Sequence, residues 1–453
     1  MSRVLILTGD PIGAKMAGPA IRSYNMALEL SKENEVALVT STNLEPGVVA
    51  PFELHQVRPG DAAAFARLER WSDVIVFQGH GMMQFELLRT TDRIVIADIY
   101  DPMHLEMLEQ GRELPRATWD LRVAQARDAL NEQLALADFF LCASERQRLF
   151  YLGHLASLGR INPATYETDP HLDKLIGVVP FGLGSTAPVH STDVLRGVLP
   201  GIGSDDRVLI WGGGLYSWFD PETLIRATAA LAQRRPQTKL FFLGTRHPGV
   251  AQMGIVKESF DLARDLGALD TSVFFNENWV EYAERHNYLL ESAAGVSTHM
   301  SHVETTFAFR TRILDYLWAN LPMVVTEGDS FAELVEAEGL GIVVPAQDVA
   351  ALESALERVL YDDVFIAEAR ANVTRVREQF YWERTLAPLV EAVRRAEHAA
   401  DWTGSRAALA GSSRSGRRTS GLGHDLRMAW HHLVNSGPSA VTSRIRARLS
   451  RSR

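Results

Sequence analysis

The stretch that decides the fold is residues 301–327, which read SHVETTFAFRTRILDYLWANLPMVVTE. A helix is predicted in its middle, from about residue 311, because four apolar side chains recur with the spacing of one helical face: Ile313, Leu314, Leu317 and Trp318. Asn320 can end this helix in the left-handed conformation, and Pro322 prevents its continuation. Residues 323–325 follow as a short buried strand.

The first turns of the predicted helix carry Arg310, Arg312 and Asp315. A helix N-terminus beside two guanidinium groups suits a diphosphate, because free N–H groups and the helix dipole attract anions. A carboxylate one turn further on can accept hydrogen bonds from a sugar diol. The same spacing also describes a surface helix with solvated charges, and spacing alone leaves both interpretations open.

The segment Arg312–Val325 resembles the K-L-x-E-Y-x-A-x-G-x-P-V-V segment of retaining nucleotide-sugar glycosyltransferases with the GT-B fold (glycosyltransferase family 4, group 1). In that family the acidic residue binds the ribose hydroxyls of the donor. The resemblance therefore implies this role for Asp315 and places Arg312 at the family's basic position.

The family often carries an earlier acid whose loop contacts the donor sugar. Phe307 stands at that position here, so the sugar-contacting loop departs from the family pattern. The resemblance leaves Glu304 or His302 as substitutes for this donor contact.

Composition places the chain among ordinary globular proteins. Its 453 residues are enough for two or three domains, and 46% are hydrophobic and 23% charged. The single cysteine, Cys142, excludes an intramolecular disulfide framework and a cysteine-built zinc site, which fits a reducing cytoplasm. The apolar run in MSRVLILTGD is too short for a signal peptide or a membrane span.

The net charge of −10 conceals an asymmetry. From Asp401 onward ten arginines stand against Asp401 and Asp425, whereas the preceding body is strongly acidic. The acidic body argues against nucleic acid as a partner. The tail combines a Ser/Gly/Arg-rich stretch with apolar residues at helical spacing, which predicts a helix on an anionic membrane surface; a solvated, unstructured tail is the alternative.

The N-terminal half opens with a strand at 3–8, a glycine-bearing loop at 9–19, a helix to about 32 and a strand at 35–40. Its glycine spacing is neither a dinucleotide fingerprint nor a P-loop. It resembles the family's glycine-rich acceptor-side loop, with Gly18 and Arg22 as the positions implied.

Further strands are predicted at 73–77, 93–98 and 139–143. Polar residues follow the first two at their C-terminal ends, where open α/β sheets bind ligands. We expect His80 and Asp101 on the acceptor side of a cleft and His104 as a catalytic residue; for each histidine a structural or solvated role remains open.

Residues 175–184 resemble the family's V-I-P-N-G-V-D strand, which ends the first domain, and 185–205 read as a linker. A second series starts with a strand at 207–211 and a loop that begins with Gly212, Gly213 and Gly214. Three glycines let backbone N–H groups approach a phosphate closely.

In the family this loop has the form G-R-x-x-x-x-K, and its two basic residues hold the diphosphate. Both are missing here. The phosphate charge is therefore expected to be met by Arg246, Arg310 or Arg312.

Later strands are predicted at 239–244, 272–276, 294–298 and 341–344, and a last helix, 382–396, is long enough to cross back to the first domain. The expected fold is α/β GT-B: two Rossmann-like parallel-sheet domains facing a cleft. The expected boundaries are 1–185 (acceptor domain), 200–380 (donor domain), 381–399 (crossover helix) and 400–453 (basic tail).

The resemblance implies a retaining glycosyltransferase that moves a sugar from a nucleotide-diphosphate sugar to a glycan or lipid-linked acceptor in cell-envelope polysaccharide synthesis. It implies no cofactor and no required metal, and a cytoplasmic enzyme at the inner face of the membrane. Two alternatives remain open: a nucleotide-sugar 2-epimerase on the same fold, and a catalytically silent nucleotide-sugar-binding subunit.

Overall fold

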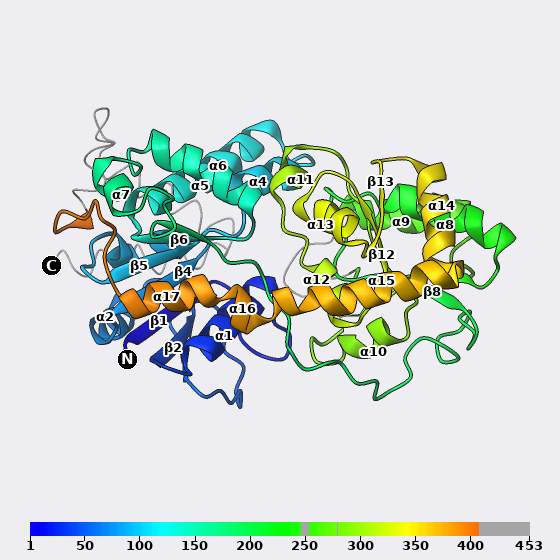
Figure 1. Cartoon of the computed structure of the whole chain (residues 1–453), viewed down its shortest axis with the longest axis horizontal. Helices are drawn as coiled ribbons and strands as arrows, with labels where there is room; N and C mark the ends of the chain where they lie inside the picture. The colour runs from blue at the N-terminus through cyan, green and yellow to red at the C-terminus, as the bar shows by residue number, and fades with distance from the viewer. Residues whose placement is uncertain (246–252, 279, 407–453) are drawn as a thin grey trace.

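The computed structural model describes residues 1–245, 253–278 and 280–406, which form two α/β lobes side by side (Figure 1). Each lobe is built on one sheet whose paired strands all run parallel. Helices cover both faces of each sheet, so the strands can be apolar on both sides.

The N-terminal lobe contains a seven-stranded sheet in the order β3-β2-β1-β4-β5-β6-β7. The strands are β1 (Arg3–Thr8), β2 (Glu35–Thr40), β3 (Glu53–Gln56), β4 (Val74–Gln78), β5 (Ile94–Asp98), β6 (Phe139–Cys142) and β7 (Ile176–Val178). The helices are α1 (Gly18–Leu30), α2 (Ala62–Trp71), α3 (Gly81–Gln84), α4 (Met103–Gln110), α5 (Arg116–Leu136), α6 (Glu145–Ser157) and α7 (Pro163–Thr168), with a short 3-10 helix η1 (Glu86–Arg89).

The C-terminal lobe contains a six-stranded sheet in the order β10-β9-β8-β11-β12-β13. The strands are β8 (Arg207–Trp211), β9 (Thr238–Phe242), β10 (Val273–Phe275), β11 (Ala294–Ser297), β12 (Met323–Thr326) and β13 (Gly341–Val344). The helices are α8 (Pro221–Arg234), α9 (Gly254–Asp265), α10 (Arg285–Leu290), α11 (Val303–Phe307), α12 (Arg312–Trp318), α13 (Ser330–Glu338), α14 (Val349–Tyr361) and α15 (Asp363–Val376).

In each sheet the strand order reverses beside the first strand, between β1 and β4 and between β8 and β11. Ligands of open α/β sheets bind at such switch points, outside the carboxyl ends of the strands. The loop after β1 and the glycine loop after β8 both begin there. The predicted α/β class with two Rossmann-like sheets is confirmed.

Helix α12 has the predicted form. It ends at Trp318, and Asn320, two residues on, is left-handed with a φ of 57°. The N–H of Leu321 donates to the carbonyl of Tyr316 at 2.9 Å, which closes a Schellman-type cap. Strand β12 follows and is buried along its whole length. The opening stretch therefore folds as its apolar pattern indicates.

The chain crosses back to the N-terminal lobe after α15, through the 3-10 helix η2 (Arg377–Phe380), α16 (Trp382–Thr385) and α17 (Ala387–Arg395) (Figure 1). The single helix predicted for 382–396 is interrupted at Leu386. Pro388 lacks an N–H group and cannot continue the hydrogen-bond ladder of α16. Leu389 and Val393 of α17 are fully buried in the core cluster that contains Val4 of β1.

The last described residues, 400–406, pack as a strap on the surface of the N-terminal lobe. Arg160 donates to both carboxylate oxygens of Asp401 at 2.8 and 3.1 Å. Arg406 is 1% exposed and pairs with Asp138 at 2.7 Å. Its guanidinium also donates to three backbone carbonyls, those of Thr91, Arg93 and Leu136.

This packing corrects the predicted start of the tail. Residues 400–406 belong to the N-terminal lobe because their charged groups are buried against it. The predicted membrane helices fall in 407–453, outside the described residues. Within the part of the chain that the structure describes, no helix combines the length and apolar character needed to span a membrane.

A pair of truncations tests the strap. Ending the chain after Thr403 removes Arg406 and leaves the buried Asp138 without its guanidinium partner, and ending it after Arg406 keeps that pair. We expect the shorter chain to lose about 2–3 kcal/mol of unfolding free energy in urea and the longer one to match the full chain. Equal stability of the two truncated chains would contradict the strap.

Candidate functional site

A cleft lies between the two lobes, at the carboxyl ends of both sheets. Two adjoining hollows share Gly18, Phe181, Gly213, Tyr216 and Asp315, and so form one continuous space. Further lining residues of the N-terminal lobe include Pro19, Tyr100, Asp101 and Glu106, and those of the C-terminal lobe include Gly212, Gly214, Glu304, Arg310 and Arg312.

The glycine loop after β8 is held by Tyr316 of α12. The N–H of Gly212 donates to the Tyr316 hydroxyl at 2.9 Å, and that hydroxyl lies 2.7 Å from the carbonyl of Val296. Burial raises the pKa of Tyr316 to about 12, so it stays a neutral donor. Gly213 has a φ of 98°, which L side chains rarely adopt, so the turn requires glycine here.

Arg312 lies directly over this loop. Its guanidinium is 4.1 Å from the ring centre of Trp211 and 4.0 Å from that of Phe219. Nη2 donates to the carbonyl of Gly214 at 3.2 Å, and Nη1 has no hydrogen-bond partner among the described residues. The residue is 8% exposed. Burial lowers its pKa to about 10, which keeps it charged at neutral pH.

Asp315, one turn further along α12, pairs with Arg285 of α10. Nε of Arg285 donates to Oδ1 of Asp315 at 3.0 Å, and Nη1 donates to the carbonyl of Tyr282 at 2.7 Å. Both side chains line the cleft. One oxygen of Asp315 is therefore oriented by Arg285, which leaves Oδ2 for a ligand.

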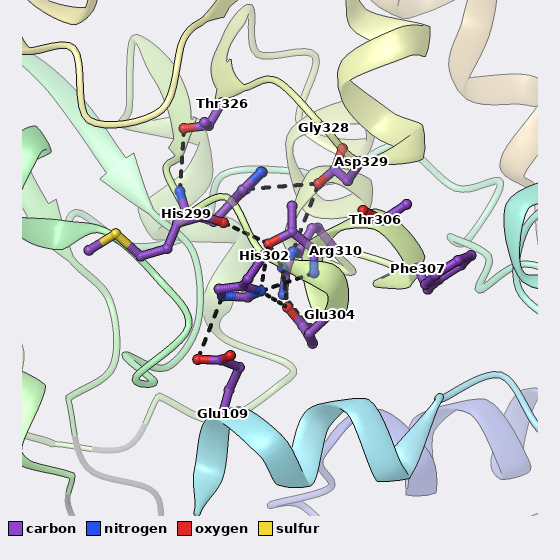
Figure 2. Close-up of polar contacts among 12 residues, drawn as sticks. Glu109, His299, His302, Glu304, Thr306, Phe307, Arg310, Thr326, Gly328 and Asp329 are labelled. Carbon is purple, nitrogen blue, oxygen red and sulfur yellow. Dashed lines mark hydrogen bonds and ion pairs between the residues drawn. The ribbon is translucent and has the colours of Figure 1, made fainter. Parts of the chain in front are cut away.

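Arg310 has a different environment from the one predicted. Nη1 and Nη2 donate to the two carboxylate oxygens of Glu304 at 3.1 and 2.8 Å, and Nε lies 3.8 Å from Asp329 (Figure 2). Arg310 and Glu304 are 6% and 5% exposed. This bidentate pair commits Arg310 to Glu304, so the prediction that it stabilises a diphosphate directly is corrected.

His302 meets the N-terminal lobe. Its Nδ1 accepts from the N–H of Thr305 at 3.3 Å, as the cap of α11, so the proton of the neutral ring is on Nε2. Nε2 lies 3.9 Å from Oε2 of Glu109 on α4 (Figure 2). Neither of these two atoms has a hydrogen-bond partner among the described residues. His302 therefore lies at the lobe interface, outside the predicted donor contact.

Two residues of α6 hold α11 from across the lobe interface. Nε2 of Gln147 donates to the carbonyl of Phe307 at 2.8 Å and to that of Tyr100 at 2.8 Å. Arg146 donates to the carbonyl of Thr306 at 3.4 Å, and it also donates to the carbonyl of Gly328 and pairs with Glu333 of α13. The segment that carries Glu304 is thus positioned by both lobes.

Asp101 and Glu106 form a carboxyl pair on the N-terminal wall. Burial, followed by the charge of Glu106 and a hydrogen bond with it, raises the pKa of Asp101 well above its usual value. Burial also raises the pKa of Glu106, and the charge of Glu304 adds to this. The raised pKa values favour the protonated form of this carboxyl pair, whose charge Glu304 opposes.

This pair makes stability depend on pH. A carboxyl group whose folded pKa is raised stabilises the protein below its unfolded pKa, and that stabilisation is lost as the pH rises through the folded value. Asp101→Asn keeps a neutral side chain, so we expect a gain of roughly 0.5–2 kcal/mol at pH 8 and none at pH 4. Thermal melts at both pH values measure this, with exposed Asp205→Asn as control; a gain equal at both would contradict it.

Three predicted residues are elsewhere. Arg22 is fully buried and bonds both oxygens of Asp98 at 2.7 and 2.8 Å, so it cannot contact an acceptor. His104 packs against Phe150 and His154, at ring distances of 5.7 and 5.9 Å. Burial lowers its pKa to about 4. Neither His104 nor His80, at the N-cap of α3, is among the described residues that line the cleft, which corrects both predictions.

Gly18, Asp101, Glu304 and Gly212–Gly214 do line the cleft, as expected, and Arg246 lies outside the described residues. Sequence reasoning missed Glu106 and Arg285. Glu106 could have been found as an acid one helical turn after Pro102. Nothing local distinguishes Arg285 from other surface arginines.

Residues 206–362 match the family model described as "Glycosyl transferases group 1". A D-inositol 3-phosphate glycosyltransferase of Actinosynnema mirum is 24% identical over 311 residues, 65% of this chain and 72% of that protein. Its counterpart from Saccharomonospora viridis is 27% identical over 198 residues, so the chain spans only 44% of that relative's length.

Solved structures match over nearly their whole length. Sucrose-phosphate synthase from Thermosynechococcus elongatus has a TM-score of 0.63 at 16% identity, covering 87% of this chain and 99% of that one. Alr3699/HepE of Anabaena, solved in complex with UDP-glucose, has a TM-score of 0.60 at 15% identity, covering 88% and 100%. These likenesses establish the GT-B fold.

Proposed function

We propose that this chain, a glycosyltransferase of the group 1 type, transfers a sugar from a nucleotide-diphosphate sugar to an acceptor hydroxyl with retention of anomeric configuration. The observation that carries the proposal is Arg312, which lines the cleft. Its guanidinium is buried and charged above a glycine loop, and its Nη1 has no hydrogen-bond partner among the described residues. Such a group binds a diphosphate strongly.

Arg312 can also supply the positive charge that the two missing basic residues of the glycine loop provide in the family. Its Nη2 bonds the loop itself, at Gly214, so its charge lies where those side chains would act. The UDP-glucose bound to the Anabaena neighbour supports a nucleotide-sugar donor on this fold.

In the proposed reaction the bond from the anomeric carbon to the diphosphate oxygen breaks, and a bond from that carbon to the acceptor oxygen forms on the same face. The acceptor proton passes to the leaving diphosphate oxygen. Arg312 and the loop N–H groups stabilise the charge that grows on this oxygen. Because these groups supply the positive charge, we propose that no metal is required.

The carboxyl groups of Asp101, Glu106 and Glu304 favour one alternative, a nucleotide-sugar 2-epimerase, because all three line the cleft. A panel of nucleotide sugars, incubated with free and lipid-linked glycan acceptors in EDTA, separates the possibilities. Transfer with the anomeric configuration retained, read by NMR, supports our proposal. Isomerisation of the donor sugar in the absence of an acceptor indicates the epimerase. Binding of a nucleotide sugar without any turnover indicates a silent subunit.

Asp315 is the proposed ribose ligand. Asp315→Asn removes the negative charge of the group that accepts hydrogen bonds from the ribose hydroxyls. We therefore expect the binding of nucleoside diphosphates to weaken by about 1.5–3 kcal/mol. Calorimetric titration measures this, and inorganic diphosphate, which has no ribose, should bind both proteins equally. Unchanged nucleotide affinity in the variant would remove Asp315 from the donor site.

Envelope polysaccharide synthesis at the inner membrane face is the setting that we propose, supported by the basic composition of residues 407–453. The full chain should sediment with anionic vesicles at low salt, and the chain that ends at Arg406 should not. Failure of the full chain to sediment would exclude the membrane role.

A further inference from the structure

The first turn of α6 contacts the C-terminal lobe beside the cleft. Gln147 of this turn is fully buried. Its Nε2 donates to the carbonyl of Tyr100 in its own lobe and to the carbonyl of Phe307 at the end of α11, both at 2.8 Å. Its Oε1 accepts from the N–H of Ala143 at 2.7 Å. A side-chain amide has two N–H donors, so both are used here and one of them joins the lobes.

The two carbonyls that Gln147 binds belong to opposite walls of the cleft. Tyr100 lines the cleft and precedes Asp101 of the N-terminal wall. Phe307 is the last residue of α11, and Glu304 of the same helix lines the C-terminal wall. A single buried amide therefore links the backbone of one wall to the backbone of the other.

The side chain of Phe307 makes a second contact between the lobes. Its ring centre lies 4.5 Å from that of Phe150 on α6, and in Figure 2 the ring points away from Glu304 and Arg310. Phe307 is not among the described residues that line the cleft. The family that residues 312–325 resemble often has an acid here that contacts the donor sugar. This chain instead has an aromatic pair, which stabilises the packing of one lobe on the other.

Arg146 adds contacts at the rim of this interface. It donates to the carbonyls of Thr306 and Gly328 and pairs with Glu333. The side chains of Arg146 and Glu333 are 26% and 67% exposed. Exposed ion pairs contribute little, because water and salt screen them. The buried amide and the aromatic pair are therefore the stronger links between the lobes.

We propose that Gln147 and Phe307 are positioning residues for the transfer reaction. Together with Phe150 they form an interlobe clasp, which holds the two walls of the cleft at one separation before any ligand binds. In the proposed function the donor binds to one wall and the acceptor to the other, and a misplacement of about 1 Å can cost about 10²-fold in rate. The glycine loop, Arg312 and Asp315 all belong to the C-terminal lobe, so donor binding does not depend on the clasp.

The separation of the lobes can be measured without turnover, so this test is independent of the proposed function. Spin labels are attached to the full chain at two exposed positions, through Ser157→Cys on α6 and Ala337→Cys on α13. Cys142 is fully buried and stays unlabelled. Double electron–electron resonance of the unliganded protein should give one narrow distribution of distances between the labels.

Two variants break the clasp, one from each lobe. Gln147→Glu keeps the size of the side chain but, when ionised, sets a carboxylate against two carbonyl oxygens. Phe307→Ala removes the aromatic contact without burying a charge, so it decides the test if Gln147→Glu does not fold. Each variant should give a longer and broader distribution of distances. Arg148→Gln is the matched control on α6 and should leave the distribution unchanged, because the described hydrogen bonds of the Arg148 guanidinium stay within the N-terminal lobe.

The second measurement is activity, and it rests on the proposed function. In Gln147→Glu and Phe307→Ala we expect kcat to fall about ten- to hundredfold, while the affinity for the donor that the nucleotide-sugar panel identifies stays unchanged. A residue that only stabilises its own lobe lowers the melting temperature and leaves kcat of the folded protein as it was.

Three outcomes overturn the inference. A broad or divided distribution in the unaltered chain shows that the lobes move freely. An unchanged distribution in both clasp variants assigns these contacts to stability alone. A clasp that opens while kcat keeps its normal value removes the positioning role. If no nucleotide sugar is turned over, the proposed function fails, whereas the distance distributions still decide whether the clasp exists.

Discussion

Replacing Arg312 by alanine lowers kcat/KM for the donor by about 10²–10³-fold, the usual cost of removing one donor that stabilises developing charge. The effect falls mainly on kcat, because charge on the leaving diphosphate grows in the transition state and Arg312 is the buried cation above the glycine loop. Initial rates over a range of donor concentrations measure it.

Two matched variants sharpen this result. Arg312→Lys keeps the charge but loses the planar contact with Trp211 and Phe219, so an intermediate rate is expected. Arg226→Ala removes an exposed arginine from the same lobe and should leave kcat/KM unchanged. Full activity of Arg312→Ala would remove the observation on which the proposed function depends.

Arg310→Ala destabilises the C-terminal lobe by about 3–5 kcal/mol, because it leaves the buried carboxylates of Glu304 and Asp329 without their cation. The urea transition of this lobe measures the loss. We expect part of it to be recovered in the double variant Arg310→Met/Glu304→Leu, which removes the buried charge of Glu304 and leaves only that of Asp329 without its cation.

This prediction separates a positioning role from a catalytic one. Arg310→Lys retains a charge beside Glu304 and should keep more than half of the stability that Arg310→Ala loses. A variant Arg310→Ala that unfolds at the normal urea concentration but turns over slowly would return Arg310 to the catalytic role that its position in the sequence suggested.

Much of the fold could be predicted from local pattern. Strands β1, β2, β8 and β13 have the predicted bounds, because a buried parallel strand is a continuous apolar run. The caps at Ser144 and Asp220 depend on single side chains, which accept from the N–H groups of Gln147 and Thr223. Strand β3 was not predicted, since Glu53-Leu-His-Gln56 is a half-exposed edge strand without apolar alternation.

The site was less predictable, because its partners come from distant parts of the chain. Arg310 and Arg312 are equivalent in sequence. Arg310 contacts Glu304, whereas Arg312 contacts Trp211, which lies far earlier in the chain. This difference in partners separates the roles of the two arginines. Arg22 was expected on the cleft, but its partner Asp98 lies 76 residues away. His104 was misplaced because α4 was not predicted, so its helical face was unknown.

The crossover affects how the protein folds during its synthesis on the ribosome. The N-terminal lobe is completed by Leu389 and Val393, which fill its core from the far end of the chain. At roughly 5–20 residues per second, synthesis delivers them about 10–40 s after residue 185. During that interval the first lobe exposes the apolar groove that α17 will cover, and the second lobe has its whole sheet once Val344 is made, before Leu389 and Val393. The lobe made first is therefore finished last, and the nascent chain is a natural client for chaperones that shield apolar grooves.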